Sequence, residues 1–390
     1  MAYYFIFPEI DTTLYSHPDR STMNAGADEL LELVKEPGSS DQFHHPSRIL
    51  IKFKNEDITN AISLMGDTNF TSSLSSSVNL QLFLAKANNI VSTHVVNAYA
   101  VSQSWNEGTG KYLNYPTGSN GTSWLFRDNS TTATSWTGSG TSTDWFGSAG
   151  GTGSISSSVL TQGGGTWYTG SAFYGSQQFL KGENLDTNIE VKEIIHKFSA
   201  SINAAKTYPE GIENYGFLLK SLDSVESDVS SSFGELQYFS SDTHTIYPPR
   251  LCFKWDDSLH NNQSLAKQTG SLNILLYDNQ QEYNQNDIVK FKINVRDKYP
   301  TRQFSTTSNY LNVGYLTTGS FYSIRDAHTE REVIPFDNSF TKLSANNEGM
   351  YFKIYMNGLQ PERYYRILLK HINNDGTTIY DDKYFFKVVR

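Results

Sequence analysis

The sequence NYGFLLK, residues 214–220, begins the stretch that decides the fold. Asn-Tyr-Gly is a turn signal, and the apolar run that follows it is typical of a buried strand. Two further strand-like runs come next, at 234–239 and 250–255, and in the second the apolar residues alternate as they do in a half-buried strand. The prolines at 248–249 can stand only at a strand start or an edge, because proline has no N–H to donate. We therefore predict antiparallel strands that close a sheet, with partners from the first 200 residues.

Earlier in the chain, apolar runs predict strands at 3–7, 28–34, 47–54, 78–86 and 93–103. The run at 28–34 is also compatible with a helical turn, and we expect the last two strands to form a hairpin-like pair. One helix is predicted over 188–206, because its apolar residues recur at a helical period. Thr187 and Glu190 form a capping-box pattern at its start.

The composition favours strands and turns over helices. Of 390 residues, 14% are aromatic and only 18% are charged, which is not a disorder signature. The net charge of −9 argues against a nucleic-acid binder and against attraction to an anionic membrane surface. The single cysteine, Cys252, excludes an intramolecular disulfide and is expected to be a small buried residue. We find no signal peptide and no apolar run that could span a membrane, so we expect synthesis in a cytosol.

The segment from Trp105 to about Gln178 has an unusual composition. It holds 15 of the 28 glycines and five of the six tryptophans, and no Lys or Arg occurs over 128–180. A featureless loop of this length is not expected inside a compact domain unless it is functional. Two interpretations stay open: an arm or aromatic platform that docks on a neighbouring subunit or a sugar, and hairpins whose tryptophans fold back onto their own domain. The candidate contact residues are Trp124, Trp136, Trp145, Trp167 and Tyr168.

A second domain is predicted over 272–390, after a polar linker at 257–271 that lacks periodicity. Its seven expected strands fit one small sandwich and lie at 272–277, 288–296, 310–316, 321–325, 350–356, 363–371 and 379–389. Leu359, Pro361 and Tyr365 resemble in their spacing the corner that enters a strand of fibronectin type III-like and immunoglobulin-like sandwiches.

Short motifs follow one another in a fixed order along the first two-thirds of the chain. They are DTTL (11–14) with NAG (24–26), SRILIKF (47–53), NLQLFL (79–84), WNEGT (105–109), the segment 190–198, NYGFLLK and PPRL (248–251). The ordered set resembles the DNRLRE-type β-sandwich, a jelly-roll module related to carbohydrate-binding modules of secreted polysaccharide-acting proteins. The resemblance implies a jelly-roll domain over 1–256, with an insertion at about 106–178 where the family has a short connection.

The C-terminal half resembles structural proteins of marine contractile-tailed phages. The matching segments are IRDAHTEREVIPFD (324–337), NEGMYF (347–352), GLQPERYY (358–365) and YFFKVVR (384–390). This resemblance implies a location in the virion. It agrees with the cytosolic composition, because virion proteins are made in the host cytoplasm without signal peptide or disulfide.

No motif for catalysis or for a cofactor stands out. We find no phosphate-binding loop, His-Glu-x-x-His motif or nucleophile elbow. Adjacent acids such as Asp256-Asp257 point to opposite faces of a strand, and His44-His45 lacks a second cluster at metal-ligand spacing. We therefore expect no catalytic, metal or cofactor site.

Three hypotheses remain. The first is a non-enzymatic virion structural protein of the tail, neck or baseplate, with other virion proteins as partners in a symmetric assembly. The second is a carbohydrate-binding module with a glycan partner, and the third is a hydrolase, which needs paired carboxylates in a deep pocket. Neither nucleic acid nor a membrane is an expected partner.

Overall fold

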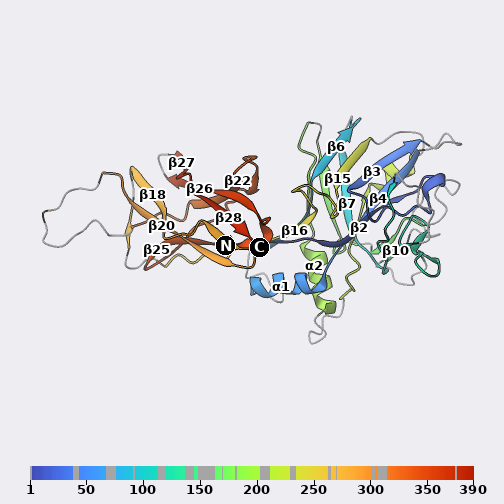
Figure 1. Ribbon diagram of the computed structural model, residues 1–390, viewed down its shortest axis with the longest axis horizontal. Helices are drawn as coiled ribbons and strands as arrows, with labels where there is room; N and C mark the ends of the chain where they lie inside the picture. The colour runs from blue at the N-terminus through green and yellow to red at the C-terminus, as the bar shows by residue number, and fades with distance from the viewer. Residues whose placement is uncertain are drawn as a thin grey trace. The chain divides into compact units, whose positions relative to one another are not determined.

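The computed structural model describes residues 2–37, 44–66, 76–90, 93–112, 120–136, 145–147, 163–168, 170–180, 182–202, 211–228, 234–261, 265–268, 270–299, 304, 314–373 and 376–390. They form two compact units (Figure 1). The larger unit consists of Ile6–Asn69 and Val78–Cys252, and the smaller is built mainly from Phe253–Arg390. Strands dominate the chain, which confirms the predicted all-β sandwich class.

The larger unit is organised around an eight-stranded antiparallel sheet. Its strands, in spatial order, are β12 (Tyr174–Phe179), β7 (His94–Ala100), β14 (Phe217–Ser221), β4 (His44–Phe53), β3 (Leu30–Pro37), β15 (Glu235–Phe239) and β6 (Leu84–Asn88), with β2 (Pro8–Tyr15) also paired to β4. The NYGFLLK run supplies β14, which pairs with β4 and β7 as predicted for antiparallel strands. All five β14 residues are buried, which explains why its apolar residues are consecutive rather than alternating.

A second sheet has four strands, in the order β1 (Ala2–Ile6), β16 (Arg250–Trp255), β5 (Ser76–Leu82) and β13 (Thr187–Glu190). Cys252, on β16, is buried as expected. The predicted hairpin of 78–86 with 93–103 is wrong, because β5 belongs to a different sheet from β7, and β6, which continues the run, pairs with β15. The larger unit also contains two short antiparallel pairs: β8 (Phe126–Asp128) with β9 (Thr134–Ser135), and β10 (Trp145–Gly147) with β11 (Thr166–Tyr168).

The described helices differ from the prediction. No helix was predicted at α1 (Asn55–Met65). The predicted helix 188–206 corresponds to α2 (Lys192–Ile202), which begins at Lys192 rather than at 188, and residues 203–206 lie outside the described residues. The capping box is also wrong, because Thr187 and Glu190 belong to β13. The Thr187 hydroxyl accepts a hydrogen bond from the Leu82 N–H at 2.8 Å, and the Glu190 carboxylate accepts one from the Val78 N–H at 3.0 Å. A short α3 (Asp223–Ser227) follows β14, and no described helix is long and apolar enough to cross a membrane.

The smaller unit contains two principal sheets. The first has the order β18 (Leu272–Tyr277), β20 (Ile288–Asp297), β25 (Gly349–Tyr355) and β24 (Ser344–Asn346). The second has the order β19 (Glu282–Asn284), β28 (Phe385–Val389), β26 (Arg363–Asn373), β22 (Ser320–Asp326) and β23 (Glu332–Ile334), with β27 (Gly376–Tyr380) also paired to β26. A short parallel pair joins β17 (Ala266–Lys267), which lies in the predicted linker, to β21 (Gly314–Tyr315).

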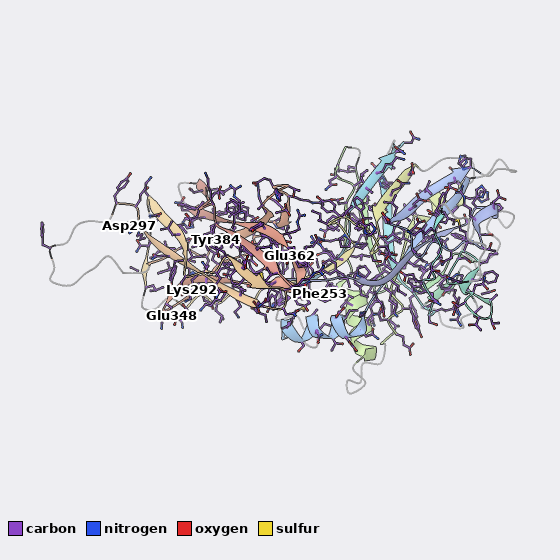
Figure 2. The ribbon with its side chains drawn as sticks, in the orientation of Figure 1. Phe253, Lys292, Asp297, Glu348, Glu362 and Tyr384 are labelled. Carbon is purple, nitrogen blue, oxygen red and sulfur yellow. The ribbon has the colours of Figure 1, made fainter. Side chains whose placement is uncertain are left out.

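An aromatic core holds the smaller unit together. Phe291 on β20 stacks on Phe352 of β25 at 5.3 Å between ring centroids. Tyr384, which is labelled in Figure 2, meets Phe291 edge-on at 6.1 Å. The Tyr365 hydroxyl donates a 3.1 Å hydrogen bond to the carbonyl oxygen of Gln360. This bond closes the corner that the Leu-x-Pro-x-x-x-Tyr spacing predicted, because a tyrosine at such a corner bonds to backbone a few residues upstream.

Candidate functional site

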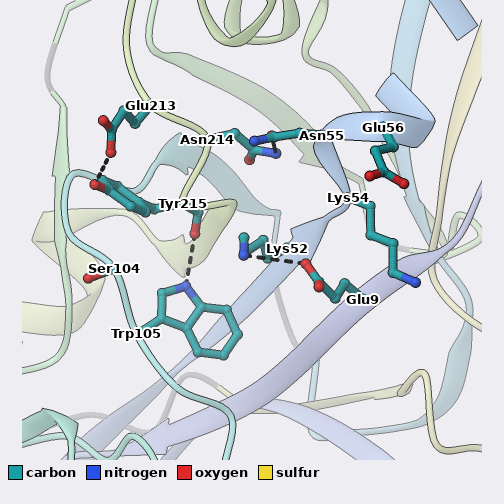
Figure 3. A pocket seen from close by; sticks show the side chains of 10 residues that line it. All are labelled: Glu9, Lys52, Lys54, Asn55, Glu56, Ser104, Trp105, Glu213, Asn214 and Tyr215. Atoms are coloured by element: carbon teal, nitrogen blue, oxygen red, sulfur yellow. Dashed lines mark hydrogen bonds and ion pairs between the residues drawn. The ribbon is translucent and has the colours of Figure 1, made fainter. Parts of the chain in front are cut away.

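An open pocket of about 730 Å³ lies in the larger unit beside the NYGFLLK turn (Figure 3). A pocket of this size can hold a small ligand of a few rings. Its lining is mixed in charge and includes two aromatic residues: Glu9, Lys52, Lys54, Asn55, Glu56, Ser104, Trp105, Glu213, Asn214 and Tyr215.

Asn214 fixes the turn that forms one wall of the pocket. Its side-chain amide donates to the carbonyl oxygen of Phe53 at 2.9 Å and to Oδ1 of Asn55 at 2.8 Å, while its own Oδ1 accepts from the N–H of Gly216 at 3.0 Å. Gly216 has φ +90°, and a Cβ there would overlap the carbonyl oxygen of Ile51. The Asn-Tyr-Gly turn signal is thus explained: Asn214 is needed for the hydrogen bonds of its side-chain amide, and Gly216 for its positive φ.

Two aromatic residues are held firmly at the pocket. The indole Nε1 of Trp105 donates a 2.8 Å hydrogen bond to the carbonyl oxygen of Tyr215, and the Tyr215 hydroxyl donates to Glu213. The hydrogen bond to Glu213, helped by burial, raises the pKa of Tyr215 to about 12, so its hydroxyl stays protonated at neutral pH. Lys52 and Glu9 form an ion pair of 3.3 Å across the pocket (Figure 3). The arrangement offers donors, acceptors and an aromatic ring to a polar ligand.

The tryptophans predicted to contact a partner are mostly inside the larger unit. Trp124, Trp136 and Trp167 are only 3%, 2% and 3% exposed, and they share one core cluster with Trp105. An aromatic platform made from these three residues is therefore not present, and they fold back onto their own unit. The side chain of Trp145 lies outside the described residues, and Tyr168 is half-buried and stacks on Phe173 at 5.2 Å.

A buried ion cluster lies under these tryptophans. Glu226 of α3 accepts from Arg48 of β4 at 2.7 and 3.2 Å, and its Oε2 lies 3.0 Å from Nζ of Lys220. The three side chains are 1%, 3% and 2% exposed. Burial opposes ionisation of Glu226, but the two cations outweigh it and lower its pKa. The Arg48 guanidinium lies 4.7 Å from the ring centroid of Trp124 and 5.0 Å from that of Trp167. This cluster is enclosed and serves the packing of the sheet.

Three motifs that are far apart in the sequence meet at one edge of the eight-stranded sheet. The side-chain amide of Asn24 donates to the carbonyl oxygens of Glu107 at 2.5 Å and Thr122 at 2.7 Å, and the N–H of Asp11 donates to Oε1 of Glu107 at 2.9 Å. A Cβ at Gly26 would overlap the backbone of Glu107. No role was predicted for the motifs DTTL, NAG and WNEGT, because only the fold brings them together.

Comparison with known proteins does not identify a family. No protein-family model matches the sequence, and no curated protein matches it significantly. Among the described residues, no group of three or more His, Cys, Asp or Glu side chains is arranged to hold a metal ion. The site must therefore be interpreted from its own chemistry.

Proposed function

We propose that the chain is a non-enzymatic structural protein of a contractile-tailed phage particle, and that its smaller unit contacts neighbouring particle proteins. The C-terminal resemblance gives the context. The observation that carries the proposal is a set of exposed apolar side chains on one face of the six-stranded sheet of that unit, Tyr364, Ile372, Ile379 and Phe385, which are 52%, 38%, 57% and 41% exposed.

These four side chains lie on one face. Phe385 pairs with Arg366 and Lys387 pairs with Tyr364, and since alternate residues of a strand share a face, Tyr364 and Phe385 point the same way. Ile372 lies an even number of residues along β26 from Tyr364, and Ile379 of β27 pairs with Lys370, so both extend this face. The four residues form two pairs along β26, with Arg366 and Lys370 between them on the same face. Exposed aromatic and aliphatic side chains mixed with arginine in this way are typical of protein contact surfaces.

Incorporation into particles tests this proposal. A phage whose own copy is deleted would be complemented with the wild-type chain, with Ile379→Glu and with Ile288→Glu, and the purified particles would be analysed by mass spectrometry. Ile288 is a matched control, because it is 55% exposed on β20 of the other sheet. We expect Ile379→Glu to fold, as judged by circular dichroism, but to be lost from particles, while Ile288→Glu is incorporated. Equal incorporation of both variants, or a wild-type chain absent from particles, contradicts the proposal.

A second function, saccharide binding, is favoured by the pocket of the larger unit. Sugar hydroxyls both donate and accept hydrogen bonds, so they match a lining that offers carboxylates of Glu9 and Glu56 beside ammonium groups of Lys52 and Lys54. The half-buried ring of Tyr215 supplies an apolar surface for a sugar ring. In this proposal Tyr215 and Trp105, which line the pocket, take the role predicted for Trp124, Trp136 and Trp167.

A glycan array followed by titration calorimetry tests saccharide binding. We expect Tyr215→Ala to weaken binding at least tenfold, and Tyr174→Ala to leave it unchanged. Tyr174 is a suitable control because it is 42% exposed in the same unit but does not line the pocket. Binding that survives Tyr215→Ala would move the saccharide elsewhere, and an array without any hit would remove this function.

A further inference from the structure

A second open pocket, of about 240 Å³, lies on the four-stranded sheet of the smaller unit. Pockets for drug-sized ligands usually have about 300–1,000 Å³, so this one has room for a single ring. Two of its lining residues, Lys292 and Glu348, are labelled in Figure 2. The lining comes from all four strands and from the turn between β24 and β25: Tyr277, Lys290, Lys292, Asn346, Glu348, Gly349, Met350 and Tyr351.

The strand register places the cations and the rings of the pocket on one face of the sheet. Lys292 pairs with Tyr277 on one side and with Tyr351 on the other, so the three residues form a row across the strands. Lys290 shares this face because it lies two residues along β20, and its Nζ is 4.0 Å from the ring centroid of Tyr351. Phe291, between the two lysines, points to the opposite face and is buried. The pocket is therefore on the solvent side of the sheet.

This face is positive, although the net charge of the chain is −9. Lys353 pairs with Lys290, and Arg296 lies an even number of residues from Lys292, so four cations share the face. The four strands contribute no Asp or Glu to the same face. Charge complementarity thus favours a negatively charged partner.

Two carboxylates in the flanking turns balance part of this charge. Asp278 lies 2.6 Å from Lys292, and Glu348 lies 3.9 Å from Lys290. Their side chains are 69% and 79% exposed. Exposed ion pairs of this kind contribute little free energy, so an anion that enters the pocket can take the place of either carboxylate beside the lysines.

We propose that this pocket binds a saccharide that carries a carboxylate or a sulfate group, with Lys290 and Lys292 as the partners of that group. Ammonium groups form strong charge-assisted hydrogen bonds with such oxyanions. The half-buried ring of Tyr277 offers an apolar surface to the sugar ring.

The polar remainder of the lining suits the hydroxyl groups of the same ligand. Oδ1 of Asn346 accepts a 3.0 Å hydrogen bond from the N–H of Glu348, which leaves the Asn346 amide nitrogen as a donor. The Glu348 carboxylate accepts hydrogen bonds from hydroxyls, whereas it repels the closely spaced phosphates of a nucleic acid. An acidic saccharide therefore uses every kind of group in the pocket. This site is separate from the pocket of the larger unit and does not depend on the function proposed for it.

Titration calorimetry on the full chain tests the site with oligosaccharides of equal length. The probes are an oligogalacturonate with carboxylates, a carrageenan-derived oligosaccharide with sulfates, and a neutral maltooligosaccharide. We expect an acidic probe to bind, with the tighter of the two identifying the anionic group, and added salt to weaken it because salt screens exposed charges. Lys292→Gln should weaken binding about tenfold, because a hydrogen bond to a charged group is lost.

Lys353→Gln is the matched control. Lys353 is exposed on the same face and its loss changes the net charge equally, but it does not line the pocket, so the affinity should hardly change. Tyr277→Ala keeps the charge but removes the ring, and it should weaken binding. Tyr215→Ala alters only the pocket of the larger unit and should leave the binding of the acidic probe unchanged. Circular dichroism checks that each variant is folded, and Lys290→Gln replaces Lys292→Gln if that variant is not.

Three outcomes would overturn the proposal. If neither acidic probe binds the wild-type chain, the site does not exist. If Lys353→Gln weakens binding as much as Lys292→Gln, the face attracts anions through its overall charge and not through the pocket. If polyglutamate or an oligothymidylate competes as well as the best acidic saccharide, the surface accepts polyanions of any class and the assignment to saccharides is wrong.

Discussion

Replacing Glu226 by Gln tests whether the buried ion cluster holds the larger unit together. The substitution keeps the shape of the side chain but removes the charge that Arg48 and Lys220 share. Among the residues that the structure describes, Asp223 is the other carboxylate paired with the cluster; it is 73% exposed and pairs with Lys220, so the guanidinium of Arg48, only 3% exposed, loses its carboxylate partner. Breaking a buried ion pair in this way costs about 3–5 kcal/mol. We expect a loss of stability in that range.

Equilibrium unfolding in guanidinium chloride, followed by tryptophan fluorescence, measures this loss. The probe is suited to the site, because Trp124 and Trp167 lie directly over the Arg48 guanidinium. Glu9→Gln serves as the control: it removes the carboxylate of a 3.3 Å pair with Lys52, but the two side chains are 38% and 29% exposed. Exposed pairs are worth at most about 1 kcal/mol. If Glu226→Gln costs no more than this control, the charges of the cluster do not stabilise the fold and the reasoning is wrong.

Three further changes test other parts of the structure. Tyr365→Phe removes the corner bond to Gln360 and should cost the smaller unit about 1 kcal/mol in thermal unfolding, whereas an unchanged midpoint would show that the corner does not depend on the bond. Gly216→Ala forces an alanine to φ +90° against a backbone carbonyl and should cost about 1–3 kcal/mol or more in urea unfolding, an expectation that a neutral variant would disprove. Burial lowers the pKa of His371 below 6.5, so protons bind the unfolded state more readily than the folded state, and the smaller unit should lose stability as pH falls below about 6.5. His371→Gln should flatten this pH dependence. A stability that instead rises on acidification would refute this prediction.

The sequence was informative where one local pattern dominates. Alternating or continuous apolar runs predicted β4, β14, β16 and β20, since burial of one or both sheet faces imposes that pattern. The run at 28–34 was compatible with a helical turn as well, and the strand favoured by the family resemblance is confirmed by β3 (Leu30–Pro37). The helix α1 was missed although its buried residues Ile58, Ala61, Ile62 and Met65 have helical spacing. The helix begins with a polar turn and its apolar stripe is only three turns long, so the helical pattern is weak in the sequence.

Pairing between distant segments could not be predicted from local patterns. Thr187 and Glu190 match a capping box, but their side chains bond backbone N–H groups of β5, more than a hundred residues away. The same limit applies to the pocket, where Trp105 meets Tyr215, and to the edge where Asp11 meets Glu107. Each of these contacts exists only because the sheet order places the segments together. The order of the motifs singled out these segments, but it did not predict that they contact one another.

Two tryptophans and one glycine of the Trp- and Gly-rich segment cover a buried charge. Residues 128–180 contain no Lys or Arg, yet Trp167 lies over the cations of both Arg48 and Lys220, which β4 and β14 supply. Aromatic faces attract these cations and at the same time exclude water from their pairing with Glu226. Glycine is needed beside them: Gly164 has φ +79°, its carbonyl oxygen accepts from Arg48 at 2.7 Å, and a Cβ there would lie 2.6 Å from the guanidinium. The ring of Trp167 and the small Gly164 therefore act together, because both allow the segment to pack closely over the buried Arg48 guanidinium.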